Sequence, residues 1–266
     1  MPITKNNKNK KNLFIVLLSI FLVILTYSFP PIPQDLEYHN FADKRTFLSI
    51  PNFGDVMGNI AFLIFGIMGV HYICSQCKDW EDIFYNKFEK FLWKFFFIAI
   101  CLVTFGSGYY HFSPDNDSLM WDRLPMTLGF MSFFAITIIE RINYKLGVRL
   151  FPILLVIGVF SVLYWSYTEN LGEGDLRLYV LVQFLPIIVI PFMLFLFDSP
   201  YTHTKKLINV VVWYLIAKVL EHFDHDIFEL TQNIVSGHTL KHVAAAFSAY
   251  YMMVYLKNRK KIEIKS

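Results

Sequence analysis

The sequence predicts an all-α membrane protein, and three observations lead to this fold class. Hydrophobic residues make up 55% of the 266 positions and charged residues only 17%, whereas soluble proteins have roughly 45–50% and about 25%. The apolar residues form eight long blocks, most of them near the ~20 residues that a helix needs to cross a bilayer. Lys and Arg fall in alternate loops between these blocks. The expected spans are 13–29, 56–73, 91–110, 119–140, 150–168, 177–197, 207–223 and 238–256.

The distribution of Lys and Arg predicts the orientation of these spans. The basic segments are 1–12, 75–90, 141–149, 198–206 and 257–266, and together they hold 17 Lys and Arg residues. The loops on the opposite side, 30–55, 111–118, 169–176 and 224–237, hold only Lys44 and Arg45. Because basic loops stay in the cytoplasm, both termini are expected there and the acidic loops outside. The net charge of +3 reflects this topology and gives no reason to expect nucleic-acid binding.

This topology divides the chain into five parts. A basic cytoplasmic tail (1–12) precedes an N-terminal anchor helix (13–29), which is followed by PPIP and no small-residue cleavage site. An outer loop (30–55) could act as a lid. A core of seven helices (56–256) and a second basic cytoplasmic tail (257–266) complete the chain.

A polar stretch, GSGYYHFSPDNDSLMWDR, joins the third and fourth spans at the outer face. Ser107 and His111 are four residues apart, so a helix places them on one face. Asp122 follows eleven residues after His111 and starts the next, antiparallel span at the same depth. Ionisable groups within a membrane are costly and usually mark a functional site.

The last span adds two histidines at the same end of the core. His238 and His242 are again four residues apart, in SGHTLKHVAAAFSAYY. Three neutral imidazoles with one open position are a common ligand set for catalytic zinc. Asp122 could then act as a general base, and Ser107 could donate a hydrogen bond to an oxyanion.

A structural interpretation of the same residues remains open. A histidine at a helix end is commonly an interfacial or packing residue, and the His-x-x-x-His spacing also arises by chance. Asp122 could cap the fourth span or pair with Arg123. Ser107, between two glycines, could serve close helix packing.

Polar residues at the outer end of the seventh span also have two interpretations. The cluster of Glu221, His222, Asp224, His225 and Asp226 could form a second shell around the ligating histidines or a secondary cation site. A solvated acidic loop is the favoured interpretation of the same residues.

Three further polar residues are given provisional roles. Asn59, inside the second span, either lies near the site or bonds across the bundle. Lys241 is expected to extend to lipid headgroups. His39 is assigned to a structural role in the outer loop.

The pattern of Ser107, His111, Asp122 and the His238–His242 pair resembles the CREST superfamily of membrane hydrolases. FADKRTFLSIPNFGDVMGN and SGHTLKHVAAAFSAY are similar to bacterial members of the alkaline ceramidase family. The resemblance covers residues 38–256 and leaves the anchor helix outside.

The resemblance implies a seven-helix bundle around zinc, with His111, His238 and His242 as ligands. Ser107 and Asp122 match the family's other two motif positions. The implied reaction is cleavage of the amide of a ceramide-like membrane lipid, giving a sphingoid base and a fatty acid. Animal members also bind calcium through a motif of acidic residues and tryptophan. This chain offers only Asp43 and Asn52 in that segment, so calcium is not expected.

Two other classes of function are compatible with the pattern. A seven-helix receptor or sensor could use zinc structurally and hydrolyse nothing. A transporter fits less well, because the polar groups lie at one end of the spans and no internal repeat is visible. The composition and the expected orientation favour a bacterial inner membrane, with the site toward the outer face.

Overall fold

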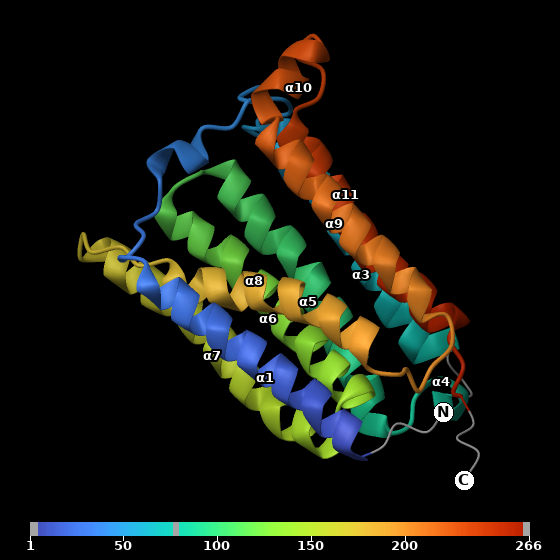
Figure 1. Ribbon diagram of the computed structural model, residues 1–266. Coiled ribbons are helices and arrows are strands. Elements are labelled where there is room, and N and C mark those ends of the chain that lie inside the picture. The colour runs from blue at the N-terminus through green and yellow to red at the C-terminus, as the bar shows by residue number, and fades with distance from the viewer. Residues whose placement is uncertain (1–4, 77–79, 263–266) are drawn as a thin grey trace. The chain divides into compact units, whose positions relative to one another are not determined.

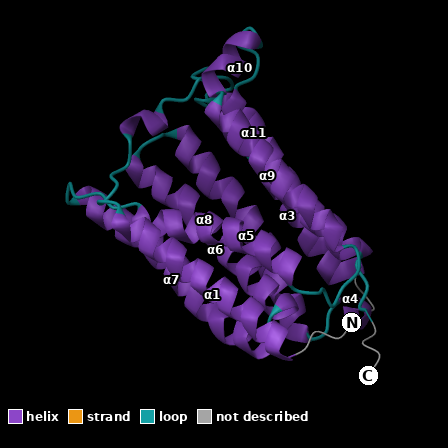
Figure 2. Ribbon diagram, in the orientation of Figure 1, coloured by secondary structure: helices purple, strands orange, loops and turns teal. Residues whose placement is uncertain are grey.

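The computed structural model describes residues 5–76 and 80–262, and all regular elements in these residues are helices (Figures 1 and 2). This confirms the predicted all-α class. The chain divides into two compact units. The first comprises Met1–Gln34 and Phe130–Pro200, and the second comprises Asp35–Gly129 and Tyr201–Ser266. Helix α6 (Asn116–Arg141) passes from the second unit into the first.

The first unit contains the end of α6 and three further helices. These are α1 (Lys5–Ser28), α7 (Tyr144–Asn170) and α8 (Arg177–Leu196). Helix α1 packs against α8, and Ile15 of α1 shares a buried apolar cluster with Val189 of α8. The expected anchor helix therefore has its own packing partner.

The second unit contains the polar residues singled out in the sequence. Its main helices are α2 (Phe53–Gly58), α3 (Ile60–His71), α5 (Lys87–Phe112), α9 (Leu207–His222) and α11 (Gly237–Asn258). The short helices are α4 (Trp80–Ile83) and α10 (Asp224–Leu230). Helices α3, α9 and α11 run side by side (Figure 1). Phe62, Val103 and Ala246 join α3, α5 and α11 in one apolar cluster.

Six helical segments among the described residues are long and apolar enough to cross a membrane. They include α1, α5, α6, α7 and α8, and a segment from Phe53 to Ser75 that contains α2 and α3. The expected spans 207–223 and 238–256 form helices α9 and α11, and α9 has only 16 residues. The membrane character is thus supported, whereas the count of seven core spans plus an anchor stays a prediction.

Some boundaries differ from those expected. The second span begins at Phe53 and is interrupted at Asn59, whose carbonyl accepts a hydrogen bond from Thr104 Oγ1 at 3.1 Å. Helix α1 begins at Lys5, so part of the basic tail is helical. The ends of the two expected tails, 1–4 and 263–266, lie outside the described residues.

A buried ion pair fastens the end of α11 to the start of α5. Arg259 is 1% exposed, and its Nη2 lies 2.9 Å from Oε1 of Glu89. The same oxygen accepts a hydrogen bond from the Tyr201 hydroxyl at 2.6 Å. The Arg259 guanidinium also stacks over the Tyr201 ring, 3.9 Å from its centroid. Arg259 therefore belongs to the folded core, although the sequence places it in a basic tail.

Replacing Arg259 by Met should destabilise the protein strongly, because Glu89 would remain buried without its cation. Removing one partner of a buried ion pair typically costs about 3–5 kcal/mol. Lys260 is exposed and has a similar side-chain length, so Lys260→Met is the matched control. Thermal unfolding in detergent micelles should separate the two variants. Equal melting temperatures would contradict a structural role for this pair.

Candidate metal centre

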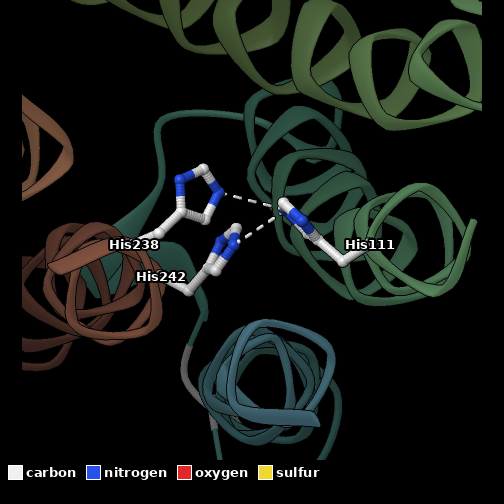
Figure 3. A group of neighbouring side chains, drawn as sticks. All are labelled: His111, His238 and His242. Atoms are coloured by element: carbon white, nitrogen blue, oxygen red, sulfur yellow. Dashed lines mark hydrogen bonds between the residues drawn. The ribbon is translucent and has the colours of Figure 1, made fainter. Parts of the chain in front are cut away.

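Three histidines from two helices converge inside the second unit (Figure 3). His111 lies in the last turn of α5, and His238 and His242 lie in the first two turns of α11. The Nε2 atom of His111 is 3.3 Å from Nε2 of His238 and 3.0 Å from Nε2 of His242. All three side chains are buried. The sequence prediction that these residues meet is therefore confirmed.

The separations of 3.3 and 3.0 Å from the His111 nitrogen are close to those that a tetrahedral metal ion requires, and all three ligand atoms lie within 4.8 Å of one another. Bonds of 2.0–2.1 Å to imidazole nitrogens place neighbouring ligand atoms about 3.3 Å apart. A neutral imidazole has only one N–H and one lone pair, so hydrogen bonds alone cannot satisfy three Nε2 atoms that face one point. A cation would satisfy all three. His111, His238 and His242 thus form a buried group that could hold a metal ion.

Ser107 and Asp122 lie next to each other where α5 approaches α6. Ser107 is 1% exposed and Asp122 is 8% exposed. The two side chains interact, although the Ser107 hydroxyl forms no hydrogen bond of ordinary length in the described part of the chain. Ser107 is one helical turn before His111, so its hydroxyl lies on the side of α5 that carries the imidazole. This buried hydroxyl, which lies beside the Asp122 carboxylate, could also bond to a bound molecule.

The close approach of α5 and α6 depends on Gly106. A Cβ atom at this position would collide with the backbone carbonyl oxygen of Trp121 in α6. Gly108, two residues later, faces open space. Gly106 therefore lets the helices carrying Ser107 and Asp122 come together.

Packing replaces hydrogen bonding around His111. Its Nδ1 is buried and has no hydrogen-bond partner among the described residues, so it lacks the acceptor that usually orients a metal-binding imidazole. The rings of Phe41 and Tyr110 lie 4.6 and 4.8 Å from the His111 ring, centroid to centroid. The Asn52 side chain donates a hydrogen bond to the His111 carbonyl at 2.8 Å. Apolar contact and backbone anchoring thus hold this ring.

The N-terminus of α11 rests on two buried acids. Asp224 accepts a hydrogen bond from the His238 backbone N–H at 2.7 Å. Asp55, at the start of α2, accepts hydrogen bonds from the hydroxyls of Ser236 and Thr239 at 2.9 and 2.7 Å. Asp55 is fully buried, and its Oδ2 has no hydrogen-bond partner in the described part of the chain. These contacts fix the helix turn from which His238 and His242 project.

The proposed second-shell residues differ in their exposure and in their contacts. Glu221 forms ion pairs with Lys218 and Lys241, at 2.6 and 2.7 Å. His222 and His225 are exposed, and the His225 ring bonds to the Asn40 carbonyl. Asn59 is fully buried and bonds to the Asp55 carbonyl of its own helix turn.

Lys241 differs from its expected position. Its side chain is only 16% exposed and pairs with Glu221, so it does not extend freely toward headgroups. The ammonium also interacts with Asp122 and Tyr38. Lys241 therefore contributes a partly buried positive charge, next to its neighbour in sequence His242.

Sequence reasoning missed several residues of this site. Phe41 and Asp55 were not selected, and His39 was assigned a structural role only. Asp224 was named as a possible second-shell residue, and its hydrogen bond to the His238 N–H places it there. His39 bonds to the Tyr110 hydroxyl and to Asn116 Oδ1, each at 2.9 Å. Asp55 could have been noticed, because it directly precedes an apolar block and its carboxylate must enter the bundle with it. Nothing local in the sequence marks Phe41.

Asp43 and Asn52, the two residues considered for calcium, have protein partners. Both carboxylate oxygens of Asp43 accept hydrogen bonds from Arg45, each at 2.7 Å. Asp43 Oδ2 also accepts from the Gly54 N–H at 3.2 Å. Burial raises the pKa of Asp43, but the hydrogen bonds and charge of Arg45 outweigh it and hold the pKa below its ordinary value.

Comparison with models of known protein families finds no match, and comparison with curated proteins finds none either. The family resemblance noted in the sequence therefore gains no support from these comparisons.

Substituting Gly106 by Ala should destabilise the protein, because the new methyl group forces α5 away from the Trp121 carbonyl. Overpacking of this kind typically costs about 1–3 kcal/mol. Gly108→Ala should be neutral or slightly stabilising, because alanine favours a helix by roughly 0.5–1 kcal/mol over glycine. Thermal unfolding of both variants in the same detergent measures the difference. A Gly106→Ala protein as stable as Gly108→Ala would contradict the close helix contact.

The Asp43–Arg45 pair should stabilise the protein only above acidic pH. The Asp43 pKa is lower in the folded state than the ordinary value of about 3.9. The stabilisation is therefore present at neutral pH and declines as pH falls through the unfolded and then the folded pKa. We expect wild type to melt above Asp43→Asn at pH 7, with the gap shrinking below about pH 4. A gap that stays constant with pH would exclude ionisation of Asp43 as its source.

Proposed function

We propose that this protein is a zinc-dependent membrane amidase that cleaves ceramide-like N-acyl lipids into a fatty acid and an amine. The observation that carries the proposal is the buried His111–His238–His242 group with Ser107 and Asp122 on the neighbouring helices. Three imidazoles leave one position of a tetrahedral zinc open, as in catalytic zinc sites. The six apolar helices suit a lipid substrate.

The roles of the protein groups follow from their chemistry. Bound zinc would supply a Lewis acid that activates water and polarises the amide carbonyl. The Asp122 carboxylate would accept a proton from the attacking water and pass it to the leaving nitrogen as the C–N bond breaks. The Ser107 hydroxyl would donate a hydrogen bond to the carbonyl oxygen as its negative charge develops.

The proposed setting is a bacterial inner membrane, with both termini cytoplasmic and the site toward the outer face. The distribution of Lys and Arg supports this orientation. A lipid with its amide near the headgroups could then reach the histidines from the side of the bilayer. Calcium is not part of the proposal, because Asp43 is occupied by Arg45.

Zinc content and lipid hydrolysis, measured on the same purified samples, test the proposal. His238→Ala should lose zinc, whereas the control His203→Ala, at an exposed loop histidine, should keep it. Asp122→Asn should keep zinc and lose about 10²–10⁴-fold in hydrolysis of N-acyl lipids, the usual contribution of a general acid–base group. Asp117→Asn, at an exposed acid in the first turn of α6, should retain wild-type activity.

Two results would overturn parts of the proposal. Equal zinc content in wild type and His238→Ala would remove His238 from the site. Zinc-loaded wild type that cleaves none of a panel of N-acyl lipids would exclude the amidase. That result would favour a receptor or sensor with structural zinc, in which His111→Ala unfolds the protein and Asp122→Asn has no effect.

A further inference from the structure

Residues 40–45, which we call the strap, contact two of the three histidines, His111 and His238, through Phe41. Phe41 is 4% exposed. Its ring centroid lies 4.6 Å from that of His111 and 4.4 Å from that of His238. One apolar ring therefore covers a ligand from α5 and a ligand from α11.

Asp224 joins the strap to the helix that carries His238. Its Oδ2 accepts a hydrogen bond from the Ala42 N–H in the strap at 2.9 Å. Its Oδ1 accepts from the His238 N–H at 2.7 Å. The residue is only 7% exposed, so both hydrogen bonds are shielded from water and strengthened by the charge of the carboxylate.

The His238 hydrogen bond has a particular structural role. His238 is the second residue of α11, and the N–H groups of a first helical turn have no partner within the helix. Ser236 accepts a hydrogen bond from the Thr239 N–H at 2.9 Å, and Asp224 accepts from His238. Loss of the Asp224 acceptor would leave a buried N–H unpaired directly at a metal-ligating residue.

Two further contacts fasten the strap to the segment between α9 and α11. His225 bonds to the Asn40 carbonyl at 3.0 Å. Arg45 donates hydrogen bonds to the carbonyls of Asn233 and Ile234, at 2.5 and 3.0 Å. Both contacts are exposed and therefore weaker than those of Asp224. Of these three residues that hold the strap, Asp224 is the buried one.

We propose that Asp224 is a positioning residue that couples closure of the strap to the placement of His238. Because one carboxylate holds both segments, opening the strap disturbs the first turn of α11, and binding of metal at the histidines stabilises the closed strap. By thermodynamic reciprocity, each event favours the other to the same degree. The inference rests on the metal centre of the proposed function and is independent of the reaction catalysed there.

Metal affinity and proteolysis of the strap test this coupling in the full-length protein in detergent. Zinc affinity is measured by competition with a chelator, and trypsin cleavage after the exposed Lys44 reports strap opening. In wild type, zinc should slow cleavage at Lys44. Asp224→Asn keeps the side-chain shape but turns one acceptor into a donor that faces an N–H. It should weaken zinc binding by about 10–100-fold, as for other residues that support metal ligands, and speed cleavage.

Two variants serve as controls. Asp226→Asn changes an exposed acid of the same short helix and should behave as wild type in both measurements. Phe41→Ala loosens the strap but leaves both hydrogen bonds of Asp224 possible. It should speed cleavage and also weaken zinc binding, and it tests the coupling if Asp224→Asn does not fold.

The possible outcomes separate this inference from the proposed function. Wild type that binds no zinc would overturn both. Wild type that binds zinc without any change in cleavage at Lys44 would overturn the coupling and leave the metal centre intact. The same conclusion would follow if Phe41→Ala sped cleavage at unchanged zinc affinity, or if Asp224→Asn matched Asp226→Asn in both measurements.

Discussion

The candidate site depends on how the first turn of α11 is held. This turn carries His238 and precedes the turn that carries His242. The backbone N–H groups of a first helical turn have no acceptor within the helix, so in a largely apolar unit they need acceptors from other residues. Asp224 accepts from the His238 N–H, Ser236 accepts from the Thr239 N–H, and Asp55 accepts from two hydroxyls. Buried carboxylates are costly unless hydrogen-bonded. The two acids and the helix end therefore stabilise each other, and the direction of both histidines follows.

Other charged groups in the second unit are also stabilised by their partners. Glu89 pairs with Arg259 at one end of α11, and Glu221 pairs with Lys241 near the other. Glu89 and Arg259 are 170 residues apart in the sequence, whereas Glu221 and Lys241 are 20 apart. Because an unpaired buried charge would cost several kcal/mol, these pairs help to define which helices lie together. The histidine group is a different case, since the Nε2 atoms of His238 and His242 both approach that of His111, which carries at most one N–H.

That difference connects the geometry to the proposed chemistry. Among the described residues, the Ser107 hydroxyl makes no hydrogen bond of ordinary length, and the Nε2 atoms of His238 and His242 both approach the Nε2 atom of His111. Hydrolysis with a bound metal requires metal ligands and a hydrogen-bond donor next to a carboxylate. The three imidazoles, Ser107 and Asp122 could fill these roles. The strap adds a cover of apolar character, which would exclude water from one side of the histidines.

The sequence by itself determined the all-helical class, the apolar spans and the convergence of His111, His238 and His242. These follow from block length, from the i, i+4 spacing that places side chains on one helix face, and from the distribution of Lys and Arg, which puts the two histidine segments at one depth. The cover by Phe41, the support from Asp55, the hydrogen bonds of Asp224 and the pairing of Lys241 with Glu221 were decided only by the tertiary structure. A lone acid or aromatic residue in a loop has no periodicity that reveals its partner. The role of Gly106 also depends on the tertiary structure, because its close contact is with the Trp121 carbonyl of the next helix.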